Sequence, residues 1–416
     1  MTRIAAEFLF HSLLPVATPE NPPRVHIGGD ECTQPYDMSL MNISAMSFGS
    51  LSDNAVRALN KGAELGGFLH DTGEGAISPY HQEANGDLMW ELGTGYFGAR
   101  DDNGDFDPQR FRDRSADEQV KCVSLKLSQG AKPGLGGMLP GAKVTPEIAE
   151  IRGIPVGQDC ISPAYHRVFS TPVELIEFTA RMRELSGGKP AGFKLCVTSR
   201  AQVLAVCKAM LEVGTTPDFI IIDGSEGGTG AAPLEFEDNM GMPLTEGLST
   251  FHNALIGTGL RNRVKLGAAG KVAAGNDIVK RLIQGADFTM SARAMMMAIG
   301  CIQAQVCNTG KCPVGVATQN PLRARALDVE DKSMRVFRYH KATVNQAVRL
   351  MAAMGVQDPS ELDYSMLRKR ISYTQTLGFD QLFDHLGEGE LLSQAPQEWE
   401  AAWNAASPHS FLPTRK

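Results

Sequence analysis

Three of the eight cysteines in this chain fall within one short segment, residues 300–319. Cys301, Cys307 and Cys312 follow the spacing C-x5-C-x4-C. Soft thiolates select iron–sulfur clusters or zinc, and closely spaced cysteines on one loop commonly hold a cluster. A tetrahedral zinc site would need a fourth ligand, and no histidine lies between residues 253 and 339. The spacing suits a three-iron cluster; the alternative is three buried thiols that serve only as small packing residues.

Three lysines and one glutamine lie where charged or hydrogen-bonding side chains could take part in binding and proton transfer. Lys126, Gln129 and Lys132 lie at the end of an apolar run and in the glycine-rich segment that follows it, and Lys194 lies between Phe193 and Leu195. Lys126 and Lys132 could bind carboxylates and donate a proton, and Lys194 could stabilise a reduced flavin. An ordinary solvated charge is the alternative for each lysine.

The elements that must position these residues alternate regularly between short apolar strands and helices. Eight strands, each followed by a helix, predict an α/β protein with a (β/α)8 barrel, and long insertions follow strands 2, 3 and 6. The first helix, over residues 50–67, is expected to start at Ser52 or Asp53. The predicted strands cover 41–49, 68–71, 120–128, 156–160, 191–197, 218–223, 263–270 and 287–292.

The predicted barrel gives the chain three parts. Residues 1–40 form an N-terminal arm, residues 41–325 form the barrel with the cysteine loop at 300–319, and residues 326–416 form a helical extension. The polar excursion 72–107 has no clear periodicity, and we expect a lid or binding loop there. A barrel places its chemistry at the carboxyl ends of its strands, so the predicted site lies at that face.

Glycines near the ends of the last three strands predict a phosphate site. Loops after strands 7 and 8 of a barrel often hold a phosphate through backbone N–H groups and a helix N-terminus. Glycines that only close tight turns are the alternative. The residues expected to contact the cofactor there are Gly227, Gly228, Gly267, Gly270, Ser291, Ala292 and Arg293, with Ser47 at the end of strand 1.

Composition limits the partners and the compartment. The net charge of −7 comes without a basic cluster, so nucleic acid and anionic membrane surfaces are not expected partners. The other five cysteines are scattered, which fits a reducing cytoplasm better than a secreted disulfide framework. Glu7 and His11 interrupt the short apolar run near the N-terminus, so a packing segment is favoured there over a signal peptide, and no membrane span is expected.

Three motifs in order resemble the FMN-binding synthase domain of glutamate synthase. They are SLKLSQGAKPGLGGMLPGAKV, DGSEGGTGAAP and CIQAQVCNTGKCPVGVATQNP, and the resemblance covers roughly residues 40–325. It implies a (β/α)8 barrel that holds FMN and a 3Fe-4S cluster. In that family reduced FMN converts the imine of 2-oxoglutarate and ammonia to L-glutamate.

The resemblance also implies roles for individual residues. Cys301, Cys307 and Cys312 match the cluster ligands, and Lys194 matches the flavin lysine. Glu74, in TGEGA, matches a glutamate where an ammonia tunnel reaches the synthase site. Lys126, Gln129 and Lys132 match the positions that hold FMN and the oxoacid.

The chain departs from the family pattern in several places. The family begins with a glutaminase domain whose nucleophile is an N-terminal cysteine, whereas this chain begins Met1, Thr2, Arg3, so we expect nitrogen to come from elsewhere than glutamine. The family's β-helix domain is replaced by the helical extension. An Arg-Phe-Gly near the flavin becomes Tyr96, Phe97, Gly98, which makes Tyr96 the expected substrate contact and removes the arginine that the family has at this place.

The resemblance implies an FMN and iron–sulfur oxidoreductase that aminates a 2-oxoacid such as 2-oxoglutarate with ammonia or an amine. The alternatives are an N-methylglutamate synthase-type catalytic subunit that uses methylamine, a flavin-dependent dehydrogenase of another substrate, and an electron-transfer subunit. No strand–GxGxxG–helix unit is apparent, so we expect electrons from ferredoxin or a separate flavoprotein subunit. A separate amidotransferase subunit and a homo- or hetero-oligomer are also expected.

Overall fold

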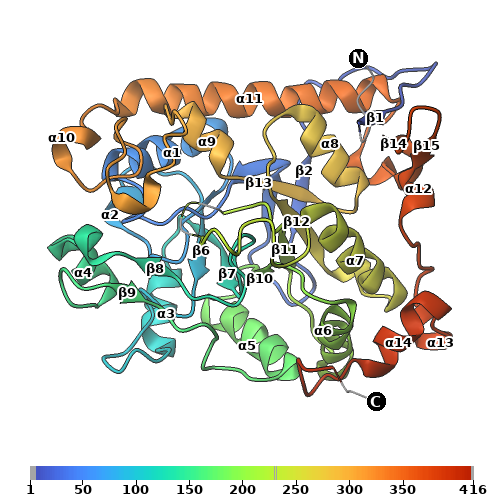
Figure 1. The fold of residues 1–416 in the computed structure, drawn as a ribbon, viewed down its shortest axis with the longest axis horizontal. Helices are drawn as coiled ribbons and strands as arrows, with labels where there is room; N and C mark the ends of the chain where they lie inside the picture. The colour runs from blue at the N-terminus through green and yellow to red at the C-terminus, as the bar shows by residue number, and fades with distance from the viewer. Residues whose placement is uncertain (1–5, 229, 231, 414–416) are drawn as a thin grey trace.

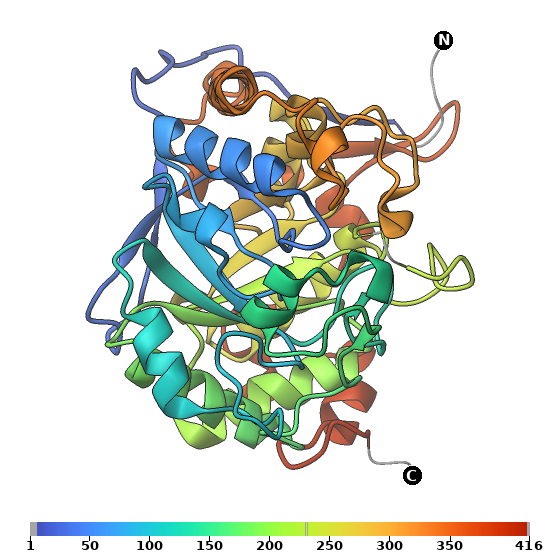
Figure 2. The same ribbon diagram turned by 90° about the vertical axis from the view of Figure 1, so that its left-hand side faces the viewer.

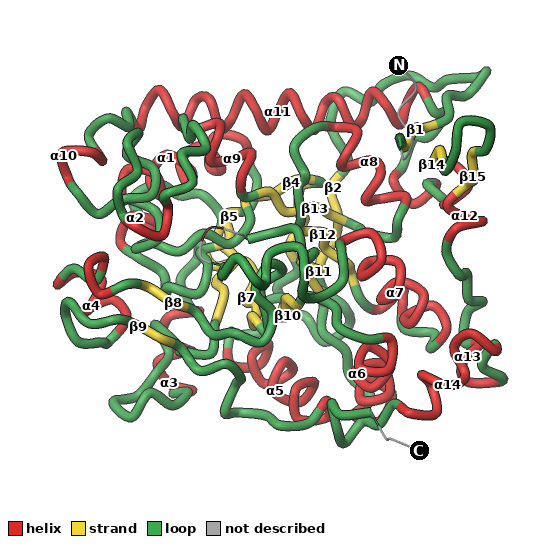
Figure 3. The backbone as a smooth tube through the Cα atoms, in the orientation of Figure 1, coloured by secondary structure: helices red, strands yellow, loops and turns green. Residues whose placement is uncertain are grey.

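A closed barrel of eight parallel strands forms the centre of the protein, in a computed structural model that describes residues 6–228, 230 and 232–413. Each strand pairs with the next along the chain, and the last pairs with the first, which confirms the predicted (β/α)8 barrel. Figure 3 shows the strands at the centre with helices around them. The barrel strands are β4 (Met41–Ile43), β5 (His70–Asp71), β6 (Leu88–Leu92), β7 (Val120–Lys126), β10 (Ala191–Leu195), β11 (Phe219–Asp223), β12 (Lys265–Ala269) and β13 (Phe288–Ser291).

One predicted barrel strand was wrong and another was missed. Residues 156–160 stay outside the barrel, because Cys160–Ile161 is β9, which pairs antiparallel with β8 (Met138–Leu139). The place in the barrel belongs to β6, which lies inside the excursion 72–107 where no regular structure was expected. Glu91 places a charged residue in the apolar run of β6, so the run does not look like a buried strand. In the folded barrel Glu91 is buried in an ion pair with Lys194 of β10, a contact that the local sequence cannot show.

Most helices cover the barrel strands from outside, as the alternation predicts. The first, α1, starts at Ser52, whose hydroxyl accepts the N–H of Ala55, and ends at Gly67 with φ of 61°. The predicted N-cap is therefore confirmed. The helices that follow barrel strands are α1 (Asp53–Gly66), α2 (Pro79–Gln82), α3 (Pro108–Ser115), α5 (Pro172–Leu185), α6 (Arg200–Val213), α7 (Leu244–Gly257), α8 (Gly275–Ile283) and α9 (Arg293–Ala298), with α4 (Pro146–Arg152) in the insertion after β7 and α10 (Pro321–Ala324) after the cysteine loop.

The long helix α11 (Val329–Ala353) completes the ring of helices. It runs along the outside of the barrel next to α1, α8 and the short α9 (Figures 1 and 2). His340 of α11 stacks on Phe68 with ring centroids 3.7 Å apart, and its Nε2 lies 2.9 Å from the carbonyl oxygen of Met41 in β4. The helical wall of the barrel therefore continues beyond residue 325, where we expected the barrel to end.

The two ends of the chain meet in a small sheet. β1 (Glu7–Leu9) pairs with β14 (Leu367–Arg370), which pairs with β15 (Thr376–Gly378). The extension therefore contains strands as well as helices, whereas the sequence predicted helices alone. The further helices of the extension are α12 (Phe379–Leu382), α13 (Glu390–Ser393) and α14 (Gln397–Ala405). In the N-terminal arm, β2 (Arg24–Ile27) and β3 (Tyr36–Ser39) form a hairpin that packs on the barrel interior through Ile27 and Met38. Within the described ranges, no helix has the length and apolar character that crossing a membrane requires.

Candidate functional site

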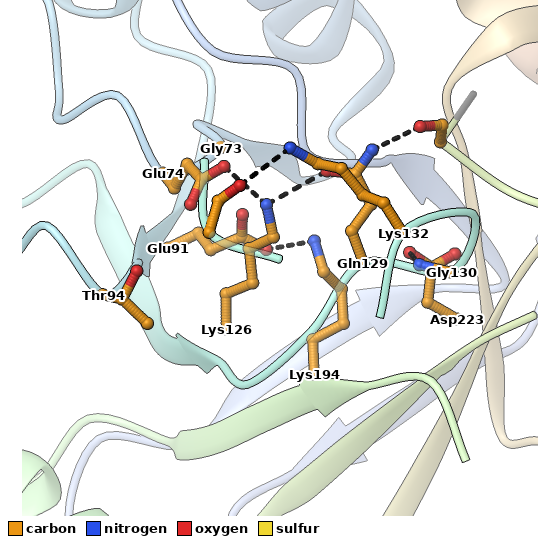
Figure 4. A network of polar contacts seen from close by, with 12 residues as sticks. Gly73, Glu74, Glu91, Thr94, Lys126, Gln129, Gly130, Lys132, Lys194 and Asp223 are labelled. Carbon is orange, nitrogen blue, oxygen red and sulfur yellow. Dashed lines mark hydrogen bonds and ion pairs between the residues drawn. The ribbon is translucent and has the colours of Figure 1, made fainter. Parts of the chain in front are cut away.

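Charged side chains gather at the carboxyl ends of consecutive barrel strands, where they face one another (Figure 4). Glu74 follows β5, Lys126 ends β7, Lys194 lies in β10 and Asp223 ends β11. Parallel strands bring these ends to one face, which is where (β/α)8 proteins carry their active sites. The structure thus brings together most of the residues predicted from the strand ends.

An ion pair between Glu74 and Lys126 forms the centre of this site. Lys126 Nζ lies 2.6 Å from Glu74 Oε1 and 3.1 Å from Gln129 Oε1. Burial acts to raise the pKa of Glu74, but Lys126, with help from Lys132 and Lys194, lowers it to about 2. The carboxylate fits closely between two glycines, since a Cβ at Gly93 or Gly137 would come within 2.6 or 2.8 Å of its oxygens. Glu74 is therefore ionised and firmly placed.

Gln129 and Lys132 lie in the insertion that follows β7. The Gln129 amide donates a hydrogen bond to the Gly228 carbonyl, which joins this insertion to the loop after β11. Lys132 donates to the Gly136 carbonyl at 3.1 Å and is 3% exposed. Burial and the charge of Lys126 lower the pKa of Lys132. Gln129 thus contacts Lys126 directly, Lys132 lies a few residues further along the same insertion, and the roles of both residues stay predictions.

Lys194 lies deeper in the barrel, in contact with Glu91 of β6. Burial would lower the pKa of Lys194, but the carboxylates of Glu91, Asp71 and Asp223 raise it. Burial also raises the pKa of Asp71 to about 8, with a further contribution from the charge of Glu91. The sequence drew attention to Lys194 and to Asp223 at the end of its strand, but not to Glu91 and Asp71, which come from two other strands.

Tyr96 does not occupy the place expected of a substrate contact. It is completely buried, and its hydroxyl accepts the N–H of Arg167 at 3.0 Å and lies 3.2 Å from His166 Nδ1. His166 Nε2 lies 2.8 Å from the carbonyl oxygen of Lys126, and burial lowers the pKa of His166 to about 4. Tyr96 and the neutral His166 therefore support the strand end that carries Lys126, and the Tyr96 ring packs against Phe106 with ring centroids 5.9 Å apart.

A buried arginine that the sequence did not single out lies beside Glu74. Arg152, at the end of α4, donates from Nη2 to the Phe48 carbonyl at 2.9 Å, and its guanidinium carbon lies 5.2 Å from the centre of the Phe97 ring. Its Nε has no hydrogen-bond partner, and no carboxylate in the part of the chain that the structure describes forms an ion pair with it. Its place at the end of an ordinary helix gives no sign of this burial.

The predicted phosphate loops lie close together. A Cβ at Gly227 would lie 3.6 Å from the Cα of Gly270, and Ser291 Oγ donates to the Val272 carbonyl at 2.8 Å. Gly270 and Gly228 have φ of 146° and 75°, which favour glycine. Ala292 precedes α9, and the exposed Arg293 is its first residue.

Gly267 is an exception among these glycines, because it does not lie in a loop. It lies within β12, where a Cβ would come within 2.6 Å of the Phe288 ring. Its placement in the loop after strand 7 was therefore wrong. The absence of a side chain there makes room for the Phe288 ring in the barrel interior.

The three predicted cluster ligands line one pocket outside the barrel mouth. Cys301, Cys307 and Cys312 all belong to the lining of this small pocket. Burial raises the pKa of the Cys307 thiol, and the nearby Cys301 and Cys312 raise it further. No group of three His, Cys, Asp or Glu side chains converges on a single ion position in the described ranges. The other lining residues are Met296, Ile302, Ala304, Gln305, Val306, Val314, Val316 and Ala317.

The cysteine loop is hydrogen-bonded to the loop after β4, which carries Ser47. Gln319 donates to the carbonyls of Gly49 and Leu51 at 3.0 and 2.8 Å, and Ser52 Oγ donates to the Gly315 carbonyl at 2.6 Å. Ser47 itself lies against the loop after β5, since a Cβ at Gly73 would come within 2.8 Å of its hydroxyl. The loops that carry Ser47, Glu74 and the cysteines are thus one packed unit.

The fold and this site define a class of protein: a (β/α)8 barrel with a buried cationic site at the carboxyl ends of its strands and a cysteine pocket beside it. The conserved region in glutamate synthase matches residues 13–357. The chain therefore belongs to the glutamate synthase family.

Similar proteins agree with this placement. The chain is 42% identical to the glutamate synthase large subunit-like protein YerD of Bacillus subtilis over 335 residues. This matched region covers 80% of this chain and 63% of YerD. The chain is 34% identical to the archaeal glutamate synthase (NADPH) of Methanocaldococcus jannaschii, over 77% of this chain and 60% of that one. The chain thus spans about three fifths of the length of these relatives.

Among solved structures, a mandelate oxidase mutant with (S)-mandelic acid has a TM-score of 0.52 at 13% identity, over 88% of this chain and 87% of that one. This likeness concerns the fold alone.

Proposed function

We propose that this protein is an FMN and iron–sulfur oxidoreductase that reductively aminates 2-oxoglutarate, or a closely similar dicarboxylic 2-oxoacid, with ammonia. The main support is the set of buried cations around Glu74. Lys126 forms an ion pair with Glu74, whereas Arg152 and Lys132 each donate to a backbone carbonyl and form no ion pair with any described carboxylate. Arg152 also lies beside the Cys160 thiol. A substrate with two carboxylates would supply the missing anions, because buried cations are costly unless they are paired.

The residues present fit FMN. Gly227, Gly228 and Gly270 bring their backbones close together at the strand ends. Ser291, the last residue of β13, is joined to the loop after β12 by its hydrogen bond to the Val272 carbonyl. Such a glycine-lined group of loops at a helix N-terminus suits a phosphate. Bound FMN would supply the hydride for the reduction. Lys194, held between carboxylates, would supply the positive charge near the ring, and Gln129 and Ser47 would contact the cofactor from opposite loops.

The residues present also fit an iron–sulfur cluster. The pocket offers three thiols within otherwise mostly apolar walls, and Cys301 and Cys312 are close enough to Cys307 to raise the pKa of its thiol. Thiolates that bind different irons of one cluster need not converge on a single ion position. A 3Fe-4S cluster held by Cys301, Cys307 and Cys312 would carry electrons between a donor and the barrel mouth.

The side chains of the barrel would bind and protonate the substrate. Arg152 would bind one carboxylate through its Nε, which has no hydrogen-bond partner, since its Nη2 is already committed to the Phe48 carbonyl. Lys132 would bind the other or donate a proton from Nζ, for which its lowered pKa suits it. Glu74, which stays ionised, would hold the Lys126 ammonium and attract the nitrogen donor at the loop after β5. Tyr96 and His166 would keep Lys126 in place.

The nitrogen and the electrons are proposed to come from partners. The relatives are longer than the matched region, and the names of several include NADPH. We propose that a ferredoxin or separate flavoprotein reduces the cluster of this protein, and that ammonia arrives free or from a separate amidotransferase subunit.

A half-reaction tests the proposal. The protein, purified anaerobically and loaded with FMN, is photoreduced and then mixed with a 2-oxoacid and an amine while the flavin absorbance is followed. Rapid reoxidation is expected only when 2-oxoglutarate and ammonium are both present. Reoxidation by methylamine in place of ammonium would favour an N-methylglutamate synthase reaction, and no reoxidation by any oxoacid and amine would remove the synthase proposal.

A further inference from the structure

A second buried cation without a carboxylate partner lies beside the cysteine pocket. Lys143 is 3% exposed, and its Nζ donates to the carbonyl oxygens of Ser50 and Cys307 at 3.0 and 3.2 Å. Its aliphatic chain lies on Gly310, where a Cβ would come within 3.5 Å of Lys143 Cγ. Gly310 has φ of 70° and lies between Cys307 and Cys312. The side chain therefore reaches the middle of the cysteine loop.

The charges around Lys143 are unusual for a buried ammonium. Among the described residues, no carboxylate forms an ion pair with Lys143, and its Nζ donates to backbone carbonyls instead. Two backbone carbonyls leave such a cation poorly compensated in a dry environment. A cluster ligated by three thiolates would supply negative charge at this place.

The position of Lys143 in the fold links the cysteines to the barrel mouth. It belongs to the same insertion after β7 that carries Gln129, Lys132 and Arg152. Its two hydrogen bonds connect that insertion with the loop after β4 and with the cysteine loop. One ammonium therefore holds three segments of the site together, and it does so next to the thiols.

We propose that Lys143 is a positioning residue for the cluster, which fixes the cysteine loop against the barrel and raises the reduction potential of the cluster with its positive charge. This inference rests on the proposed cluster. One-electron reduction of the cluster by a protein donor or by dithionite adds one negative charge to it, and a nearby cation favours the product of that step. The electron goes to the iron atoms, and the proton of Lys143 stays on Nζ.

A redox titration of the cluster, followed by its EPR signal, tests this role. Lys143→Met is expected to lower the equilibrium constant for one-electron reduction at least tenfold, which corresponds to a midpoint potential more negative by about 59 mV. Lys143→Arg keeps the charge and is expected to restore most of that difference. Lys311→Met is the matched control, because Lys311 lies in the same loop but is exposed, so solvent screens its charge.

The outcomes separate this inference from the proposed function. An unchanged midpoint potential in Lys143→Met, with a cluster signal as strong as that of the unaltered protein, would overturn the role of Lys143 and leave the cluster intact. An equal shift in Lys311→Met would also overturn it. No cluster signal in the unaltered protein would remove the cluster, and with it this inference. If Lys143→Met does not fold, Lys143→Arg decides, since a potential far from that of the unaltered protein would contradict the charge argument.

Discussion

The buried cations of this protein differ in their partners, and that difference predicts what each one does. Lys126 and Lys194 each contact a carboxylate, whereas Arg152 and Lys143 contact carbonyl oxygens. A paired cation mainly stabilises the folded state around it, while one without an anionic partner is available to bind an anion. We therefore propose that Arg152 contacts the substrate, a role for which the sequence had suggested Tyr96 in the loop after β6.

Replacement of Arg152 tests this assignment. Arg152→Met is expected to lower kcat/KM for the oxoacid by about 10- to 100-fold, since hydrogen bonds to a charged group contribute about 1.5–3 kcal/mol. Most of the effect should appear in KM. Arg167→Met is the control, because Arg167 lies in the same insertion but pairs with Asp105 at the surface. Equal oxoacid KM values for Arg152→Met and the unaltered protein would exclude Arg152 from the substrate site.

Asp71 makes a prediction about pH. Its pKa is about 8 in the folded protein, against about 4 for an unfolded chain, so the folded state keeps a proton that the unfolded state has lost between these values. Stability therefore falls as pH rises from 5 to 8. Asp71→Asn removes this contribution, and its free energy of unfolding should rise relative to the unaltered protein over that range.

Urea unfolding at pH 5.5, 6.5 and 7.5 measures the effect. Asp102→Asn, which alters a carboxylate whose side chain is 97% exposed, should leave the pH dependence as it was. Parallel pH profiles for Asp71→Asn and the unaltered protein would show that the Asp71 carboxyl does not hold its proton.

At the scale of elements, the loops after β4 and β5, the insertion after β7 and the cysteine loop form one hydrogen-bonded unit. Gln319, Ser52 and Lys143 make the connecting contacts. The site therefore depends on segments that are far apart in the sequence. Loss of the proposed cluster is therefore expected to alter the position of the loop that carries Ser47 as well.

Cys307→Ser tests the cysteine loop as a ligand-bearing element. The variant is expected to lose the EPR signal of the oxidised three-iron cluster and its bound iron, while far-ultraviolet circular dichroism shows the barrel still folded. Cys32→Ser is a suitable control, because Cys32 is similarly half-buried but lies apart from the pocket. A full cluster signal in Cys307→Ser would remove Cys307 from the ligand set.

The elements also show how far sequence reasoning extends. A strand with an uninterrupted apolar run, such as Phe219–Ile222 of β11, was placed correctly, and the cap of α1 followed from Ser52. β6 was missed because Glu91 interrupts it, and its compensation by Lys194 depends on the closed barrel. Arg152 could not be recognised, since burial of a helix end depends on the loops that pack over it. Gly267 was misplaced because a glycine in a packed strand and one in a turn look alike in sequence.

At the scale of the whole molecule, the barrel is completed by a helix that follows the cysteine loop. α11 covers β4 and α1, and His340 anchors it through its contact with the Met41 carbonyl and the Phe68 ring. The pattern of residues 329–353 predicted a helix outside the barrel, but not that it closes the ring. The cysteine loop is thus held at both ends by the barrel wall.

His340→Ala measures the contribution of this anchor. Loss of its hydrogen bond and ring stacking is expected to lower the free energy of unfolding by about 2–3 kcal/mol. Lys341→Ala, the next residue on the exposed side, should change it by less than about 0.5 kcal/mol. Urea unfolding of the purified proteins gives both values, and similar stabilities for the two variants would contradict the anchoring role.

The most direct test of the proposed reaction follows the nitrogen atom. The FMN-loaded protein is photoreduced without oxygen and given 2-oxoglutarate with 15N-labelled ammonium, and the products are identified by mass spectrometry after a single turnover. Our account predicts labelled L-glutamate in proportion to the flavin that is reoxidised, and much less of it with Arg152→Met. Flavin that stays reduced, or is reoxidised without a labelled amino acid, would contradict the proposed function.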